Sequence, residues 1–261
     1  MSLVEIGPED RAVDVVFCHA TGFNALTYLR ILAPLAESRR IVIPDQRGHG
    51  FSTLSADPAG RRDWLDFRDD LLALGEALRL KGAILSGHSM GATVSLLAAA
   101  ASSALASKLV LFEPVVFSLA ERPQGGEAPP SLAQGAARRR AVFPSREAAF
   151  SAYVGRGAFA AWPAEMIADY VEGGFRDLPS GEVRLCCEPA FEAAIYAFQA
   201  HDSLAAFEAA RVSIEVWKAE QGSTFRLNPV LLPRVRIVTV EGAGHFLPME
   251  RPDVVRAAFA G

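Results

Sequence analysis

Four short apolar runs in the first half of the chain constrain its fold most strongly. They occupy residues 12–18 (AVDVVFC), 40–44 (RIVIP), 82–86 (GAILS) and 109–112 (LVLF). Each run is too short for a helix and is typical of a strand that is buried on both faces. Helical patterns stand between them, at residues 26–37, 63–79 and 90–104. This alternation predicts an α/β protein with a mostly parallel central sheet and helices on both faces.

The rest of the chain divides into a region without strands and a return of the strand pattern. From residue 116 to residue 207 no segment resembles a buried strand, and residues suited to begin helices stand at Ser145, Pro163 and Pro189. Strand-like runs follow at 212–217 (VSIEVW) and 235–240 (VRIVTV), and a short helix pattern closes the chain. We therefore expect a core made of residues 1–115 and 208–261. Residues 116–207 are predicted to form an inserted helical cap over the carboxyl edge of the sheet.

Composition and charge restrict the classes of partner. The chain has 261 residues, of which 51% are hydrophobic and 21% are charged, and its net charge is −4. Such values describe a globular protein and give no reason to expect a nucleic acid or an acidic membrane as a partner. Three consecutive arginines, Arg138, Arg139 and Arg140, are interpreted as a solvated helix face.

Cysteines and hydropathy indicate a compartment. Three cysteines, two of them the neighbours Cys186 and Cys187, cannot form a fully paired disulfide framework. The first residues lack the pattern of a secretory signal, and the longest apolar stretch, near residues 92–106, is broken by serines. We expect reduced thiols, no membrane span and a cytoplasmic protein, for which a homodimer is compatible with the sequence.

The pentapeptide Gly87-His88-Ser89-Met90-Gly91 matches the nucleophile-elbow pattern G-x-S-x-G. In that motif a strand turns sharply into a helix and presents a serine hydroxyl at the tip, and the glycines remove side chains that would collide. Here the motif stands between an apolar strand pattern and an alanine-rich helix pattern, which is the context it requires. The helix N-terminus also directs backbone N–H groups at a developing oxyanion. Ser89 is therefore the candidate nucleophile.

A serine hydroxyl needs a base to become an effective nucleophile. The chain has five histidines: His19, His49, His88, His201 and His245. His88 lies inside the elbow and is interpreted as structural, while His19, His49 and His201 are expected to be satisfied or exposed. His245 follows a strand in a Gly-Ala-Gly loop near the C-terminus, where a base reaches the nucleophile. We expect His245 to be the general base.

Several segments together resemble the capped α/β-hydrolase superfamily over nearly the whole chain. They are FCHATGF at 17–23, PDQRGHGFS at 44–52, GHSMG at 87–91 and GAGHFLPMERP at 242–252. The resemblance implies the α/β-hydrolase fold and an oxyanion hole made by the backbone N–H groups of Thr21 and Met90. The family usually has His-Gly at the first of these sites, where this chain has His19-Ala20.

The triad acid departs from the usual pattern. In most relatives an Asp follows the penultimate strand, but Ser223 falls at that place here. Some related hydrolases carry the acid after the preceding core strand, which in this chain ends at Glu113. Glu113 is the predicted acid, Glu220 is an alternative, and a weakened Ser–His dyad is a third reading.

These residues predict a serine hydrolase that cleaves a small to medium carboxylic ester by two-step acyl transfer. A serine at the elbow argues against the aspartate-based epoxide and haloalkane hydrolases of the same fold. A carbon–carbon bond hydrolase, a lactonase and a non-catalytic ligand receptor stay as alternatives. Aromatic residues of the cap are candidates to line an apolar pocket, although most such residues belong to a core. The expected substrate is an apolar, ester-like small molecule, and the sequence has no motif for a metal or a cofactor.

Overall fold

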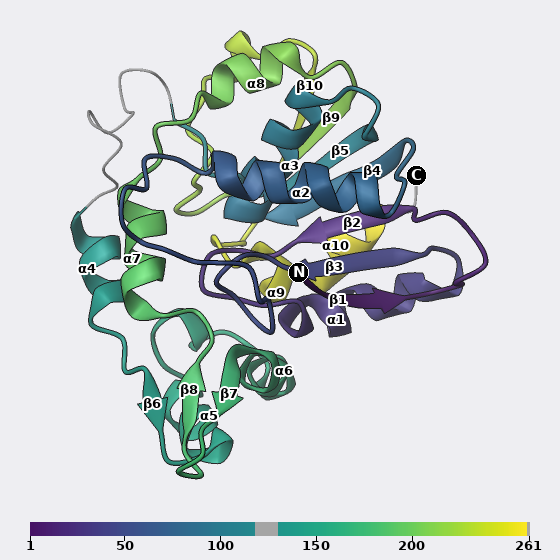
Figure 1. Ribbon diagram of the computed structural model, residues 1–261. Coiled ribbons are helices and arrows are strands. Elements are labelled where there is room, and N and C mark those ends of the chain that lie inside the picture. Colours follow the sequence, from purple (N-terminus) through teal and green to yellow (C-terminus); the bar gives the residue numbers. More distant parts are fainter. Residues whose placement is uncertain (118–129, 260–261) are drawn as a thin grey trace.

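The computed structural model describes residues 1–117 and 130–259. Its centre is a seven-stranded sheet with the strand order β1-β3-β2-β4-β5-β9-β10 (Figure 1). The strands are β1 (Ser2–Ile6), β2 (Val15–Cys18), β3 (Ile41–Asp45), β4 (Ala83–His88), β5 (Ala106–Phe112), β9 (Ser213–Ala219) and β10 (Val235–Val240). β1 is antiparallel to β3, and every other neighbouring pair of this sheet is parallel. The predicted mostly parallel sheet is confirmed.

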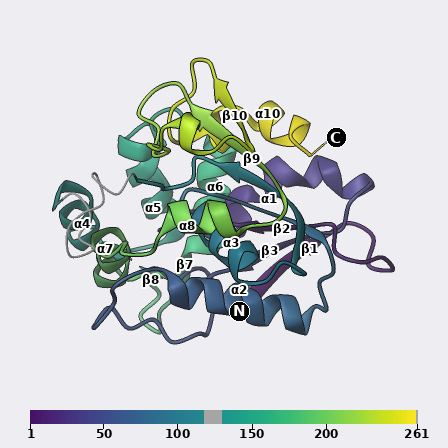
Figure 2. The same ribbon diagram turned by 90° about the horizontal axis from the view of Figure 1, so that it is seen from above.

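Helices cover both faces of this sheet, as predicted (Figures 1 and 2). On one face α2 and α8 pack against α3, and on the other α1 contacts α9 and α10. The helices are α1 (Leu26–Leu32), α2 (Leu65–Ala77), α3 (Met90–Ala101), α8 (Ser203–Ala209), α9 (Leu247–Glu250) and α10 (Pro252–Ala257), and 3₁₀ turns occupy Ala33–Glu37, Gly157–Phe159 and Pro229–Leu231.

The strand side chains show why the core strands read as continuous apolar runs. Val16 and Cys18 of β2 join the hydrophobic cluster beneath α2 and α3, whereas Val15 and Phe17 join the cluster beneath α1 and α10. All four side chains are buried. Because successive residues of a strand point to opposite faces, a strand covered by helices on both sides needs an apolar residue at every position.

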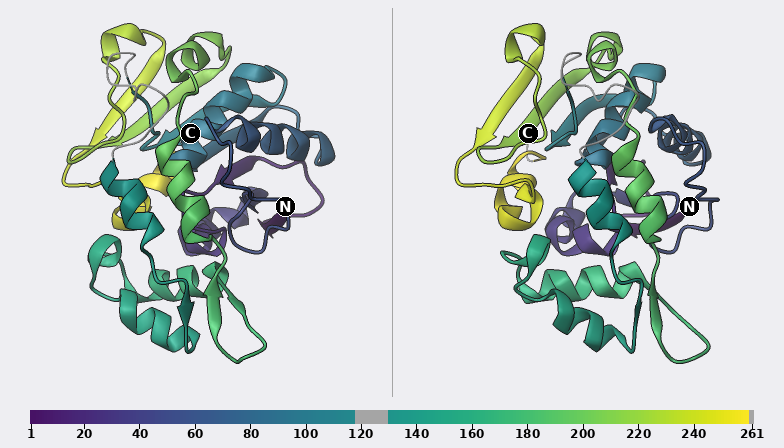
Figure 3. Two further views of the ribbon diagram at one scale, coloured as in Figure 1. Left: turned by 60° about the vertical axis from the view of Figure 1, so that its left-hand side comes forward. Right: turned by 90° about the vertical axis from the view of Figure 1, so that its left-hand side faces the viewer.

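The described part of the segment between β5 and α8 lies beyond the carboxyl edge of the central sheet (Figures 1 and 3). Its helices are α4 (Pro130–Ala137), α5 (Arg146–Tyr153), α6 (Ala164–Gly174) and α7 (Pro189–Ala197). α4 and α7 pack side by side, and α6 packs against α1 of the core. The Ser145 side chain caps α5 by accepting a hydrogen bond from the backbone N–H of Ala148, as its position predicts.

Strands within this segment were not expected from the sequence. Three short strands form a separate antiparallel sheet with the order β6-β8-β7: β6 (Val142–Phe143), β7 (Phe175–Asp177) and β8 (Val183–Leu185). Each has only two or three residues, which is too few to show an alternating pattern. The domain boundaries stay a prediction. Residues 118–129 of the expected cap lie outside the described residues, and α8 crosses the boundary expected at residue 207.

No helix within residues 1–117 and 130–259 is both long enough and apolar enough to cross a membrane.

Candidate active site

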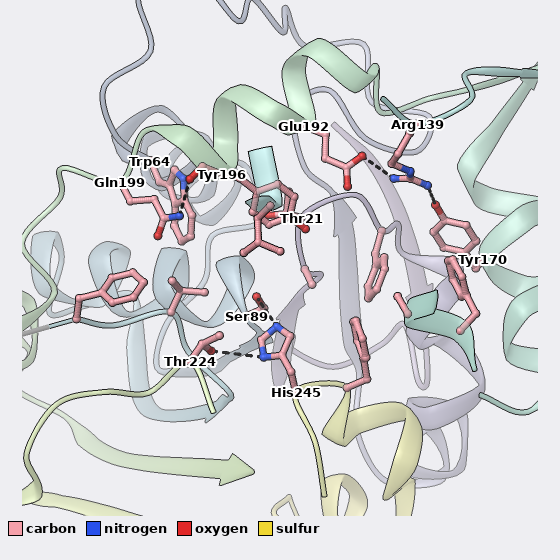
Figure 4. Close-up of a pocket in the computed structure, with 18 of the residues that line it drawn as sticks. Thr21, Trp64, Ser89, Arg139, Tyr170, Glu192, Tyr196, Gln199, Thr224 and His245 are labelled. Atoms are coloured by element: carbon pink, nitrogen blue, oxygen red, sulfur yellow. Dashed lines mark hydrogen bonds and ion pairs between the residues drawn. The ribbon is translucent and has the colours of Figure 1, made fainter. Parts of the chain in front are cut away.

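Three sequence-predicted residues meet at the carboxyl edge of the central sheet. Ser89 follows β4, Glu113 follows β5 and His245 follows β10. β4 and β5 are parallel neighbours whose last residues, His88 and Phe112, pair with each other. Because carboxyl ends of parallel strands share one edge, the residues that follow them come together. Figure 4 shows Ser89 and His245 side by side at the base of a pocket.

The elbow holds Ser89 in a backbone conformation that few residues adopt. Its φ and ψ are 54° and −119°, and its N–H donates to the carbonyl of Phe112 at 2.9 Å. A Cβ at Gly87 would lie 2.5 Å from the carbonyl oxygen of Cys18, and a Cβ at Gly91 would collide with the same oxygen. Only glycine fits at these two positions, because the β2 backbone passes directly beside the turn. α3 then begins at Met90, so Ser89 lies at its N-terminus.

His245 connects the serine to a carboxylate. Its Nε2 lies 3.2 Å from Ser89 Oγ, and its Nδ1 lies 3.0 Å from Glu113 Oε2. A carboxylate accepts hydrogen bonds, so it favours the neutral tautomer that carries its proton on Nδ1. Nε2 is then the acceptor that faces the serine hydroxyl, which is the orientation needed in a general base.

Glu113 is completely buried, and its carboxylate is surrounded by donors. The backbone N–H groups of Ala219 (2.6 Å) and Thr224 (3.0 Å) and the hydroxyl of Ser223 (2.6 Å) all donate to it. Burial by itself raises the pKa of Glu113, but the hydrogen bonds from His245, Ser223 and the two backbone groups outweigh it and lower the pKa below its usual value. The group therefore stays ionised despite its burial.

The same geometry separates the two candidate acids. Ser223, which stands where most relatives have an Asp, donates its hydroxyl to Glu113 instead of facing His245. Glu220 is exposed, and its carboxylate accepts the backbone N–H of Gly242 at 2.9 Å. The structure thus brings Glu113 to Nδ1 of His245, and it uses Glu220 to hold the loop after β10.

The predicted oxyanion donors, the backbone N–H groups of Thr21 and Met90, have no hydrogen-bond partner among the described residues. On either side of Thr21, the Ala20 N–H donates to the Tyr28 hydroxyl (3.2 Å) and the Gly22 N–H donates to Nε2 of His49 (2.9 Å). Among the hydrogen bonds of residues 1–117 and 130–259, none uses the N–H of Thr21 or of Met90. These two groups are therefore free to bind a developing oxyanion, and Thr21 and Ser89 line the same pocket.

His88, which was interpreted as structural, connects two parts of the site. Its Nε2 donates to the carbonyl of His245 at 2.8 Å, and its Nδ1 accepts from the Tyr28 hydroxyl at 2.8 Å. Burial lowers the pKa of His88 to about 3, so the ring is neutral. The chain of hydrogen bonds runs from Ala20 through Tyr28 and His88 to the backbone of His245. Sequence reasoning missed Tyr28, because nothing local on α1 indicates its distant partners.

Two further buried histidines support the loop after β2. His19 Nε2 accepts the backbone N–H of Gln46 at 3.0 Å, and His49 Nε2 accepts that of Gly22. Burial lowers the pKa of both rings. Both are satisfied side chains, and both belong to the frame around Thr21.

The pocket above Ser89 has a volume of about 330 Å³. Core residues and cap residues line it together, and the aromatic ones are Phe23, Trp64, Phe117, Tyr153, Phe159, Tyr170, Tyr196 and Phe246. Tyr153, Phe159, Tyr170 and Tyr196 of the expected cap thus reach the pocket. Others, among them Phe143, Trp162 and Phe175, pack into the hydrophobic core.

Arg139 corrects the interpretation of the arginine run as a solvated face. α4 ends at Ala137, and Arg138 and Arg140 beyond it are exposed. Arg139 instead lines the pocket, where its Nη1 lies 2.5 Å from Glu192 Oε2 and its Nη2 lies 2.6 Å from the Tyr170 hydroxyl. Figure 4 shows this group on one side of the pocket, away from Ser89 and His245. A local charge pattern cannot show that the middle arginine turns inward.

No group of three or more His, Cys, Asp or Glu side chains in the described ranges is arranged to hold a metal ion.

The chain shares sequence similarity with known proteins. A model of the alpha/beta hydrolase family matches residues 15–258. An epoxide hydrolase from Caballeronia sordidicola is 38% identical over 80 residues, which are 30% of this chain and 24% of that protein. A 2-hydroxymuconate semialdehyde hydrolase from Pseudomonas sp. (strain CF600) is 36% identical over 92 residues, which are 34% of this chain and 31% of that protein. The matches therefore span less than a third of the length of these relatives.

Solved structures agree with the family model over the whole chain. A crystal structure of E-2-(acetamidomethylene)succinate hydrolase superposes with a TM-score of 0.79 at 22% sequence identity, covering 98% of this chain and 92% of that one. At this identity the likeness establishes the fold, which is the α/β-hydrolase fold expected from the motifs.

Proposed function

Because the chain belongs to the alpha/beta hydrolase family, we propose that it is a serine hydrolase that cleaves a carboxylic ester through Ser89, His245 and Glu113. One observation carries this proposal. An unbroken line of hydrogen bonds runs from a buried carboxylate through an imidazole to a hydroxyl at the base of a pocket. Each member faces the next with the donor or acceptor that acyl transfer requires.

The first half of the reaction forms an acyl-enzyme. Nε2 of His245 takes the proton of Ser89 as Oγ attacks the ester carbonyl carbon. Glu113 holds the imidazole in the correct tautomer and stabilises the imidazolium that forms. The tetrahedral intermediate then collapses, the bond to the alcohol breaks, and the imidazolium gives its proton to the leaving oxygen.

The second half returns the enzyme to its starting state. A water molecule gives a proton to Nε2 of His245 and adds to the acyl carbonyl. Collapse of this second intermediate breaks the bond to Ser89 Oγ, which recovers its proton from His245, and the carboxylic acid leaves.

The free N–H groups of Thr21 and Met90 support both halves. Each intermediate carries a negative oxygen, and we assign its stabilisation to these two donors. Loss of one such donor costs about 3–4 kcal/mol of transition-state stabilisation. The Ala20 and Gly22 amides beside Thr21 are occupied by Tyr28 and His49, so the loop is held with the Thr21 group directed elsewhere.

The pocket sets the size of the substrate. A cavity of about 330 Å³ with mostly apolar walls fits an ester of small to medium size. The cysteines Cys18, Cys186 and Cys187 are free thiols. Unpaired thiols fit the reducing cytoplasm, which is the proposed location.

Hydrolysis of p-nitrophenyl esters from acetate to decanoate tests the proposal. Wild type is compared with Ser89→Ala, and we expect turnover by wild type and a loss on the order of 10⁴-fold or more in the variant. Circular dichroism verifies that the variant is folded. If wild type leaves every ester intact, ester hydrolysis is wrong, and carbon–carbon bond hydrolysis, lactone hydrolysis or ligand binding without catalysis must be tested instead.

A further inference from the structure

One side of the pocket carries hydrogen-bond donors that the triad does not use. Arg139 comes from the segment after α4, Tyr153 ends α5, and Tyr170 lies on α6. All three line the same pocket as Ser89. In Figure 4 the group around Arg139 and Tyr170 lies on the opposite side of Ser89 from Gln199 and Trp64. The pocket therefore has a polar end that is separate from the reacting atoms.

Arg139, Tyr153 and Tyr170 have more hydrogen-bond donors than their mutual hydrogen bonds use. A guanidinium has five N–H donors, and a phenol has one O–H donor besides its acceptor lone pairs. Arg139 Nη2 donates to the oxygens of Tyr170 (2.6 Å) and Tyr153 (3.4 Å). Both phenols thus serve Arg139 as acceptors. Within residues 1–117 and 130–259, no hydrogen bond gives either phenolic hydrogen an acceptor.

The carboxylate of Glu192 is the acceptor in this group, and it already accepts a hydrogen bond from Arg139. Glu192 is 5% exposed, and its Oε2 binds Arg139 at 2.5 Å. Its Oε1 lies against the backbone of Gly22, where an added Cβ would come within 2.5 Å of that oxygen. The Arg139–Glu192 pair is neutral as a unit, so this end of the pocket is rich in donors without a large net charge. Burial also raises the pKa of Tyr170, which keeps its hydroxyl protonated.

From this excess of donors we propose that Arg139, Tyr153 and Tyr170 form a subsite for an oxygen-acceptor group of the substrate, a carbonyl or a carboxylate, remote from the ester that Ser89 attacks. The proposal rests on the proposed function and names its substrate class: bifunctional esters with apolar chains and a second oxygen function at the far end. A plain alkyl chain in this place would bury the tyrosine hydrogens without acceptors, and a site built for hydrogen bonds discriminates strongly against such an analogue.

Length-matched esters test this subsite. The substrates are p-nitrophenyl octanoate, the p-nitrophenyl half-ester of suberic acid with a free carboxylate, and the methyl ester of that half-ester; hexanoate and adipate give a shorter set. We expect kcat/KM to be at least about tenfold higher for one or both oxygen-bearing esters than for the alkyl ester. The carboxylate and methyl-ester arms show which acceptor is preferred.

Variants test whether the tyrosines cause the preference for oxygen-bearing esters. Tyr170→Phe removes one donor and keeps the ring, so it should reduce the preference by about tenfold or more while octanoate turnover changes little. Arg226→Gln is the control, since Arg226 also lines the pocket but its guanidinium lies over the Phe117 ring, 5.9 Å from the ring centroid. This control should not change the preference.

Two kinetic results would overturn the proposal. One is equal kcat/KM for the alkyl and the oxygen-bearing esters in both length sets. The other is a preference that survives in Tyr170→Phe or disappears in Arg226→Gln. Calorimetric binding of suberate and octanoate to Ser89→Ala gives a readout without turnover. Tighter binding of suberate that Tyr170→Phe removes supports the subsite even if no ester is hydrolysed, and equal binding contradicts it.

Discussion

The two sides of the pocket are built differently. On the core side, backbone groups and buried neutral histidines fix the reacting residues: the Ser89 N–H bonds Phe112, and His88 bonds the carbonyl of His245. On the cap side, side chains hold one another, as in the Arg139–Glu192 pair and the aromatic contacts of Phe159. The core side is thus held by main-chain groups at strand ends, and the cap side by contacts between side chains of different elements.

From this difference we infer that the core side carries out the chemistry and the cap side recognises the substrate. Chemistry needs positions held to a fraction of an ångström, and main-chain hydrogen bonds at strand ends provide them. Recognition needs a shaped wall, which side chains of inserted helices provide. Changes on the core side should therefore reduce kcat, whereas changes on the cap side should alter KM or substrate preference. The following predictions test this distinction, from the largest expected effect to the smallest.

Glu113→Gln should have the largest effect. An amide cannot fix the imidazole tautomer as a carboxylate does, so kcat should fall on the order of 10³–10⁴-fold. Steady-state kinetics on the best p-nitrophenyl ester measure this. Adding Ser223→Asp, which puts a carboxylate beside the same position, should restore part of the loss. A kcat within a few-fold of wild type in Glu113→Gln would contradict the assignment of the acid.

Acid should destabilise the core side strongly. Burial lowers the folded-state pKa of His19, His49 and His88, so below about pH 6.5 the unfolded chain binds more protons than the folded chain. Each ring then removes on the order of 1 kcal/mol of stability per pH unit until its folded pKa is reached. Glu113, with a lowered pKa, stabilises the fold above the usual carboxylate pKa and loses this contribution as pH falls through its folded value.

Urea unfolding at about pH 7 and about pH 5 measures this dependence. The free energy of unfolding should be clearly smaller at the lower pH, and the decrease should be less steep in His88→Asn. Equal stability at both pH values would show that the buried rings are not held neutral.

Tyr28→Phe should reduce kcat by about 10–100-fold with KM nearly unchanged, because it removes both the acceptor for Ala20 and the donor to His88. Since Tyr28 is not itself among the residues that line the pocket, a purely structural effect would instead lower the melting temperature without this separation of kcat from KM. A double-mutant cycle with His88→Asn should show non-additive effects, because both residues belong to one chain of hydrogen bonds. Additive effects would show that Tyr28 and His88 act independently of each other.

Phe159→Leu should change recognition on the cap side. The ring lines the pocket and packs against Trp162 and Tyr170, so a smaller side chain widens the wall. KM should rise about 3–10-fold, the cost of a few methylene contacts, while kcat stays within about threefold. The ester series from acetate to decanoate measures it. A large fall in kcat at unchanged KM would contradict the distinction between a core side that sets kcat and a cap side that sets KM.

Glu220→Gln should have the smallest effect. Its carboxylate is exposed and holds the N–H of Gly242, so we expect activity within about twofold of wild type and a stability change of at most about 1 kcal/mol. A large loss of kcat in this variant would move the triad acid from Glu113 to Glu220.

The core side could largely be predicted from the sequence. Val15 to Cys18 are apolar at every position, the strands beside them begin with apolar residues, and Gly87 and Gly91 mark the turn that carries Ser89. The position of Glu113 could also be predicted from the sequence, since this residue directly follows a strand that ends at the same edge. The choice between Glu113 and Glu220 required the register of β5 and β9, which sets the donors around Glu113.

The cap side could not be predicted in the same way. Strands β6, β7 and β8 are too short to show a pattern, and Arg139 has the same local surroundings as its two exposed neighbours. One contact of the core side is equally unpredictable, because Tyr28 lies 60 positions from its partner His88. Such contacts depend on how distant elements pack, and hydrophobic periodicity carries no information about them.

Intact-protein mass spectrometry after reaction with a fluorophosphonate probe tests the central claim most directly. We expect one adduct on wild type, mapped by peptide sequencing to Ser89, and no adduct on Ser89→Ala. Labelling should also be much slower in Glu113→Gln, because the base is then poorly oriented. An unlabelled wild type, or an adduct on another residue, would contradict the assignment of Ser89 as an activated nucleophile.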